Sequence, residues 1–195
     1  MFQDQPPTNF TNHFLIAMPG LEDEGFAKSV VYMCEHSERG ALGLVINKPS
    51  AINLKKLFDK VELPLDRNDL ADAPVFQGGP VQTERGFVLH ESMMPGFEAV
   101  YASTMSIPGG LEMTTSKDVL EALSGGNGPK KVFVSLGYSA WGEGQLESEI
   151  SDNSWLTVAA DIAVIFDTPV EERYARAMGL LGLESWMLSP DAGHA

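Results

Sequence analysis

The sequence predicts an α+β fold built on a sheet that is mixed and largely antiparallel. The predicted strands outnumber the predicted helices, and the two kinds of element do not alternate regularly, as they would in a parallel α/β fold. The length of 195 residues fits a single domain over 1–195 and suffices to bury a core without disulfides or metals. We expect residues 1–12 to form a loose N-terminal segment.

Strands are predicted where short apolar or β-branched runs end at glycine, proline or a polar cluster. The first run, FLIAM at 14–18, is stopped by Pro-Gly, and the run at 131–137 has the clearest alternation. The full set of predicted strands is 14–18, 30–36, 41–47, 74–77, 86–90, 99–104, 131–137, 155–159 and 161–166.

Helices are predicted from apolar spacing and from capping residues. Residues 54–58 form a short amphipathic run, and residues 116–123 follow Thr115 or Ser116 as N-cap and stop at two glycines. Residues 142–150 have helix-forming composition with acidic residues in the first turn. The last helix starts at the capping box 168–171 with Pro169 in its first position and ends at Gly179 or Gly182.

Residues 30–47 are predicted to form a β-hairpin around the turn at 37–40. Alternation in the strand then places Tyr32, Cys34 and His36 on one face. If His36 pairs with Ala41, Cys34 lies opposite Gly43 and Tyr32 opposite Val45. This register leaves open space beside the cysteine and the histidine.

The chain is strongly acidic. It has 13 Lys+Arg against 27 Asp+Glu, a net charge of −14. Such a surface repels phosphate backbones and anionic lipid headgroups. The basic residues are scattered, with only the pairs Lys55-Lys56 and Lys130-Lys131. We therefore expect no direct nucleic-acid binding and no membrane association, and only a cationic cluster formed by the fold would favour DNA contact.

The cysteine content and the N-terminal residues indicate a cytoplasmic protein. Cys34 is the single cysteine, so no intrachain disulfide can form, which suits a reducing compartment. The first residues lack the basic and apolar regions of a signal peptide, and no apolar run reaches membrane-spanning length.

Two groups of residues are candidates for nucleophilic chemistry. Cys34 and His36 share a predicted face, but residues i and i+2 of a strand stand roughly 7 Å apart, too far for a hydrogen bond. Ser139 lies in GYSAWG, which resembles the G-x-S-x-G nucleophile elbow, except that Trp141 replaces the second glycine. A core or pocket role is favoured for Cys34, and a tight turn covered by Trp141 is favoured over a hydrolase. Amides at the following helix start form a candidate anion site, which Glu143 opposes.

No metal or cofactor is expected. The histidines at 13, 36, 90 and 194 form no paired ligand motif. Glu143 with Glu147, and Gln145 with Glu149, could bridge a cation at helical spacing, but a solvated face is the favoured interpretation. No P-loop and no G-x-G-x-x-G after a strand is present. Lys48 ends a strand, where it could hold an anion or simply face solvent.

An ordered set of segments resembles the YqgE/AlgH family of bacterial proteins. Each is weak alone, and together they span nearly the whole chain. They are 14–20 (FLIAMPG), 29–36 (SVVYMCEH), 43–49 (GLVINKP), 78–81 (GGPV), 87–90 (FVLH), 137–147 (GYSAWGEGQLE) and 193–195 (GHA).

The resemblance implies a bifurcated β-sheet folded into a pseudo-barrel with helices outside. It implies no settled activity, no catalytic residues and no cofactor. The family is labelled a transcriptional regulator by association with alginate control, a label at odds with a net charge of −14.

The function expected is a cytoplasmic binding or regulatory module that acts through a protein partner or a small ligand. The alternatives are a direct transcriptional regulator and an enzyme that uses Cys34 and His36, or Ser139. The oligomeric state is left open. The candidate ligand pocket comprises Cys34, His36, Asn47, Lys48, Gly78, Gly79, His90, Ser139 and Trp141.

Overall fold

The computed structural model describes residues 8–21, 25–94, 96 and 98–182 and shows an α+β fold. Its strands are β1 (His13–Ala17), β2 (Val30–Ser37), β3 (Gly40–Val45), β4 (Pro49–Asn53), β5 (Pro74–Gln77), β6 (Val81–Glu91), β7 (Thr104–Ile107), β8 (Leu111–Thr114), β9 (Val132–Trp141) and β10 (Trp155–Ala159). Its helices are α1 (Leu54–Lys60), α2 (Asp118–Ser124), α3 (Gln145–Ser151), α4 (Ile162–Phe166), a 3₁₀ turn at Val170–Glu172 and α5 (Arg173–Leu180).

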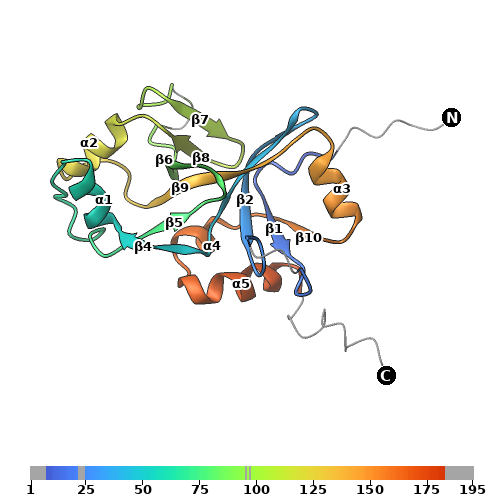
Figure 1. Cartoon of the computed structure of the whole chain (residues 1–195). Coiled ribbons are helices and arrows are strands. Elements are labelled where there is room, and N and C mark those ends of the chain that lie inside the picture. Colours follow the sequence, from blue (N-terminus) through green and yellow to red (C-terminus); the bar gives the residue numbers. More distant parts are fainter. Residues whose placement is uncertain (1–7, 22–24, 95, 97, 183–195) are drawn as a thin grey trace.

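In the described part of the chain the ten strands form one sheet that divides at β9. Its main path runs β10-β1-β2-β3-β9-β6-β8-β7, and β4 and β5 branch from β9. Every pairing is antiparallel except that of β5 with β9. The long β9 ribbon joins the two halves of the molecule (Figure 1). The predicted fold class, a largely antiparallel bifurcated sheet, is confirmed, and the sheet curls into a half-barrel.

Glycines make the division of the sheet possible. Gly79 has φ +153°, and a Cβ on it would lie 2.2 Å from the carbonyl carbon of Tyr138. A Cβ on Gly137, at φ +79°, would lie 2.6 Å from the carbonyl oxygen of Gly79. Only glycine fits where backbones come this close. The GGP and GYS motifs of the sequence therefore form the crossing of β9 with the start of β6.

In the described ranges, three apolar clusters form the core, and each lies beneath helices. The largest includes Phe14, Tyr32 and Cys34 and packs against α4 and α5. The second includes Trp141 and Trp155 and packs against α3 through Leu146, and the third lies beneath α1 and α2. Figure 1 shows α1 and α2 at one end of the molecule and α3 at the other.

Two predicted strands are wrong. Of residues 161–166, 162–166 form α4, because Asp161 caps the helix by accepting a hydrogen bond from the Ala163 amide and the helix buries Val164 and Ile165. A short apolar run does not distinguish a buried strand from a buried helix. Residues 99–103 precede β7, and hydrogen bonds from the Ala102 amide to Asp118 and from the Ser103 amide to Ser116 hold them outside the sheet.

The sequence also missed β4 and β8, and it ended β9 four residues early. Of the segment predicted to be loose, residues 10–12 contact β2, through hydrogen bonds such as that from the Asn12 amide to the Met33 carbonyl, and residues 1–7 lie outside the described residues. Among the described residues, none of the helices has the length and apolar character to cross a bilayer.

Candidate functional site

The β2–β3 hairpin contains a β-bulge at Cys34. His36 pairs with Ala41 as predicted, but Met33 pairs with Gly43 and Tyr32 with Leu44. The predicted pairings of Cys34 with Gly43 and of Tyr32 with Val45 are therefore wrong, because one extra residue on β2 shifts the register. The shift places Cys34 in the largest core cluster and His36 on the opposite face, beside Ala41.

Cys34 is a buried thiol. Its side chain is 2% exposed, and its Sγ lies 3.8 Å from the Tyr32 carbonyl oxygen. Burial raises the pKa of the thiol, and the nearby charge of Glu35 adds to the shift. The protonated form is therefore favoured, and a protonated thiol is a poor nucleophile.

His36 uses both ring nitrogens in structural contacts. Its Nδ1 accepts a hydrogen bond of 3.0 Å from the Phe10 amide, so the ring proton is on Nε2, which donates to Glu147 Oε1 at 2.6 Å. The Glu147 backbone amide and this hydrogen bond lower the pKa of the Glu147 carboxyl. The His36 ring thus clamps the N-terminal segment and α3 to β2, and neither nitrogen is free to act as a base. A shallow cleft of 280 Å³ lies beside the pair.

Ser139 lies within β9 and not at a turn. It is fully buried, and its hydroxyl donates to the Gly78 carbonyl at 3.1 Å. Because that carbonyl also accepts from the Val45 amide, Ser139 and Gly78 join β9 to β3 at the crossing. Trp141 ends the strand and packs against Trp155, with ring centroids 6.1 Å apart.

The segment after Trp141 that was predicted to begin the helix precedes α3, and its first amide is already occupied by a side chain. The Gly142 amide donates to Gln145 Oε1 at 3.0 Å. This amide is one of those that the sequence suggested for an anion.

Asn47 and Lys48 hold loops in place at the far end of β3. Asn47 accepts from the Val30 amide and donates to the Lys28 carbonyl, which closes the mouth of the hairpin. The Lys48 ammonium donates to the Gly25 carbonyl at 2.9 Å.

His90 belongs to a separate buried polar cluster on β6. Its Nδ1 donates to the Glu91 carbonyl at 2.8 Å, and its Nε2 lies 2.8 Å from the Thr114 hydroxyl. The ring also meets Tyr101 edge-on, with centroids 5.7 Å apart. His90 is fully buried.

The nine predicted pocket residues therefore lie at several places in the fold. Gly78, Gly79 and Ser139 meet at the strand crossing. His36 and Trp141 flank Ala41 across three adjacent strands, and Cys34 is in the core behind them. Asn47 and Lys48 lie at the end of β3, and His90 lies on the other branch of the sheet.

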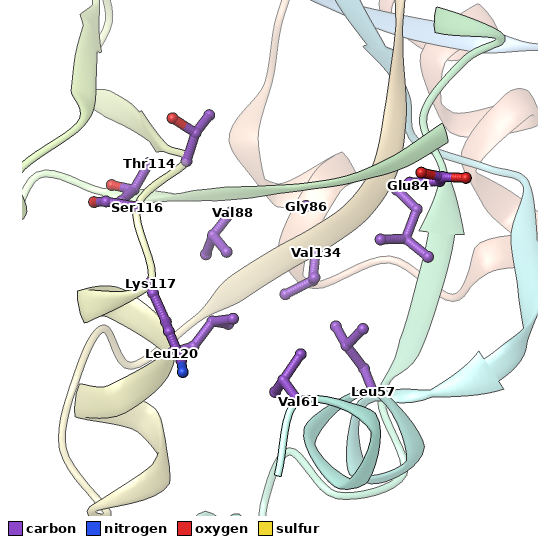
Figure 2. Close-up of a pocket in the computed structure, with 12 residues that line it drawn as sticks. Leu57, Val61, Glu84, Gly86, Val88, Thr114, Ser116, Lys117, Leu120 and Val134 are labelled. Carbon is purple, nitrogen blue, oxygen red and sulfur yellow. The ribbon is translucent and has the colours of Figure 1, made fainter. Parts of the chain in front are cut away.

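A different cleft, between α1, α2 and the sheet, is lined mostly by apolar residues. Figure 2 shows Leu57 of α1 and Val61, the C-cap of that helix, facing Val88 and Val134 of the sheet across an open space. The volume of this space is 190 Å³. Further lining residues are Glu84, Gly86, Thr114, Thr115, Ser116, Lys117, Leu120 and Leu136. Gly86 contributes to the opening, because nothing lies within 4 Å of where its Cβ would be.

The sequence carried one signal for this cleft. Leu54 and Phe58 are the buried face of α1, and Leu57 and Val61 form a second apolar pair four residues apart that is only partly buried. A helix that is apolar on two sides has a second surface to cover. The wall from Thr114 to Lys117 could not be found in the same way, because β8 was not predicted.

Basic residues distant in sequence also come together. Arg67 donates to the carbonyls of Asn127, Pro129 and Lys130. However, Arg67 pairs with Asp69 at 2.8 Å and Lys131 pairs with Asp167 at 2.6 Å. The three cations of this loop cluster are Arg67, Lys130 and Lys131. Arg67 and Lys131 are thus neutralised within the chain.

Comparison with known proteins gives the family. Residues 14–186 match the AlgH-like family, DUF179. The chain belongs to the AlgH-like family. UPF0301 proteins from Polaromonas sp. and Variovorax paradoxus are 85% and 74% identical to this AlgH-like chain, each alignment covering 100% of both proteins. The family resemblance drawn from the sequence segments is confirmed, although its last segment, 193–195, lies outside the described residues.

Two solved structures share the fold. The solution structure of AlgH from Pseudomonas aeruginosa matches with a TM-score of 0.76 and 48% identity, over 100% of both chains. A crystal structure of a Corynebacterium diphtheriae protein has a TM-score of 0.68 and 21% identity, over 91% of this chain and 88% of that one. At that identity the second likeness supports the fold alone.

Proposed function

We propose that this AlgH-like protein is a binding module that takes up a small molecule in the cleft between α1, α2 and the sheet. The observation that carries the proposal is the lining of the cleft. Leu57, Val61 and Leu120 are partly exposed there, above a sheet floor of Val88 and Val134. Apolar side chains gathered around a concave space gain free energy when a ligand removes them from water.

The alternative of an enzyme has less support from the predicted residues. The Cys34 thiol is buried, the two His36 nitrogens are engaged, and the Ser139 hydroxyl donates to a backbone carbonyl. Nucleophilic catalysis needs a nucleophile within reach of a base. These three residues stabilise the fold instead, so the proposal of binding in the cleft has more support than catalysis by these residues.

The volume of the cleft limits the ligand. An apolar cavity of about 150 Å³ accommodates benzene, and this cleft measures 190 Å³. It therefore has room for one six-membered ring, or a short alkyl chain, with a small substituent.

The test is a titration with toluene that is monitored through the backbone amide chemical shifts in NMR spectra. The largest shifts are expected for residues that line the cleft. Leu120→Trp should fill the cleft and abolish the shifts. Leu180→Trp, at a 40% exposed position on α5, is the matched control and should leave them unchanged. Shifts that centre elsewhere, or no shifts at millimolar toluene, would overturn the proposal.

A protein partner is the second candidate, and the segment between β6 and β7 favours it. Met93, Met94 and Val100 are 39%, 51% and 50% exposed. Methionine side chains adapt to partner surfaces. Cross-linking through photo-methionine in cells should then map to Met93 or Met94, and cross-links confined to other methionines would count against this surface.

The proposed function involves no direct DNA contact. It includes a cytoplasmic location. The net charge of −14 repels a phosphate backbone, and Asp69 and Asp167 pair with two cations of the loop cluster. The single, buried and unpaired Cys34 suits a reducing compartment. Sequence-selective binding of the pure protein in a gel-shift assay at low salt would contradict the first statement, and recovery outside the cytoplasmic fraction the second.

A further inference from the structure

Two oppositely charged residues line the apolar cleft. Lys117 lies on the wall at the start of α2, and Glu84 lies on the β6 side; Figure 2 shows them on opposite sides of the apolar middle. They are the charged members of the lining. The ion pairs found among the described residues involve neither of them.

The hydroxyl groups on the same wall are already engaged. The Thr114 hydroxyl lies 2.8 Å from His90 Nε2, and the Thr115 hydroxyl accepts from Arg85. The Ser116 hydroxyl donates to Asp118 at 2.5 Å. The Lys117 ammonium is therefore the group on this wall that is best placed to meet charge on a ligand, as Glu84 is on the other side.

The charge of the whole chain adds a second constraint. A net charge of −14 repels a small anion before it reaches Lys117, and Glu84 repels it again inside the cleft. A small cation, in turn, is repelled by the Lys117 ammonium. A molecule that carries both charges has no net charge to be repelled and can place each end beside its opposite.

We propose that the cleft binds a small dipolar molecule with an apolar middle, a carboxylate at one end and an amine at the other. The carboxylate lies at Lys117 and the amine at Glu84. The inference rests on the proposed function, because it names the class of ligand for the same cleft. ω-Amino acids with a ring or a short alkyl chain are the corresponding class of compound.

Four probes built on the same six-membered ring test the assignment: 4-(aminomethyl)benzoate, benzoate, benzylamine and toluene. The dipolar probe should bind tightest. Exposed ion pairs contribute modestly, so each charge should improve the Kd by about two- to fivefold. Lys117→Gln should remove the advantage over benzylamine, and Glu84→Gln the advantage over benzoate. Lys56→Gln and Glu121→Gln, at exposed positions outside the lining, are the matched controls.

A double exchange separates a charge effect from a structural one. Lys117→Glu alone should weaken the dipolar probe, and adding Glu84→Lys should restore its binding, because the ligand can then lie reversed. Equal binding of all four probes overturns the dipolar assignment and leaves the apolar cleft as the binding site. Benzoate or benzylamine binding as tightly as the dipolar probe overturns it in favour of a singly charged ligand. Failure of every probe to bind overturns the proposed function itself.

Discussion

The native protein should protect Cys34 from iodoacetamide at least about a thousandfold, relative to an exposed thiol. Cys34 lies on β2, which pairs with β1 on one side and β3 on the other, and its side chain is 2% exposed. The reagent reaches the sulfur only when β2 separates from a neighbouring strand. The reaction therefore reports an opening of the middle of the sheet.

The magnitude follows from the cost of that opening. Separating central strands needs a large share of the global stability, which is ~5–15 kcal/mol for a domain. Each 1.4 kcal/mol is about a factor of ten, so an opening at only ~4 kcal/mol already slows labelling about a thousandfold. Burial also raises the pKa of the thiol in the closed sheet, so the closed state offers no reactive thiolate and labelling proceeds through the opening.

The assay is intact-mass spectrometry of the protein during alkylation at constant pH. The exposed reference is Ser148→Cys on α3 in a Cys34→Ala background, and urea-unfolded protein gives the rate of the unprotected Cys34 thiol. The reasoning is refuted if native Cys34 labels within tenfold of the Ser148→Cys thiol while circular dichroism reports an intact fold. That result would also revive Cys34 as a candidate nucleophile.

Three further predictions concern stability, each measured by urea unfolding. Gly79→Ala should cost ~3 kcal/mol or more, because its Cβ meets backbone atoms; Gly86→Ala, where the Cβ meets nothing, should cost less than ~1 kcal/mol, and equal costs would refute the crossing argument. Asp161→Ala should cost ~1 kcal/mol through loss of the α4 cap, and no change would show that packing alone sets this helix. The Glu147 carboxyl has a lowered pKa, so its stabilisation is present above its ordinary pKa of 4.5 and is lost as the pH falls through the folded value. The stability difference between the wild type and Glu147→Gln should therefore shrink below that pH, and a difference that persists at pH 2 would contradict the contribution of the ionised Glu147 carboxylate.

Local sequence patterns predicted the fold well where the backbone conformation itself requires particular residues. The β2–β3 hairpin was placed correctly at its turn, including the pairing of His36 with Ala41. The prediction failed at Cys34, because a bulge inserts one residue without changing composition or alternation. It failed again at 161–166, where Asp161 was an unused N-cap signal and docking against the core selected a helix over a strand.

The candidate site shows the limit of the same reasoning. The segments that carry the family resemblance form the strand crossing, through Gly79, Gly137 and Ser139. Close backbone contacts require glycine, so the crossing is easily recognised in the sequence. Of the residues that line the α1–α2 cleft, only Val88 belongs to those segments. A cleft demands little of any single position beyond apolar character, so its lining leaves no motif.

The separation of the strand crossing from the cleft has a consequence for function. If the motif residues build the crossing and other residues line the cleft, then the fold and the ligand can vary independently. Lys117 and Glu84 are both exposed and 33 positions apart, and neither supports the core. Replacing either charge alone should therefore change which probe is bound most tightly while the stability of the sheet stays the same, which a site built from the motif residues themselves would not allow.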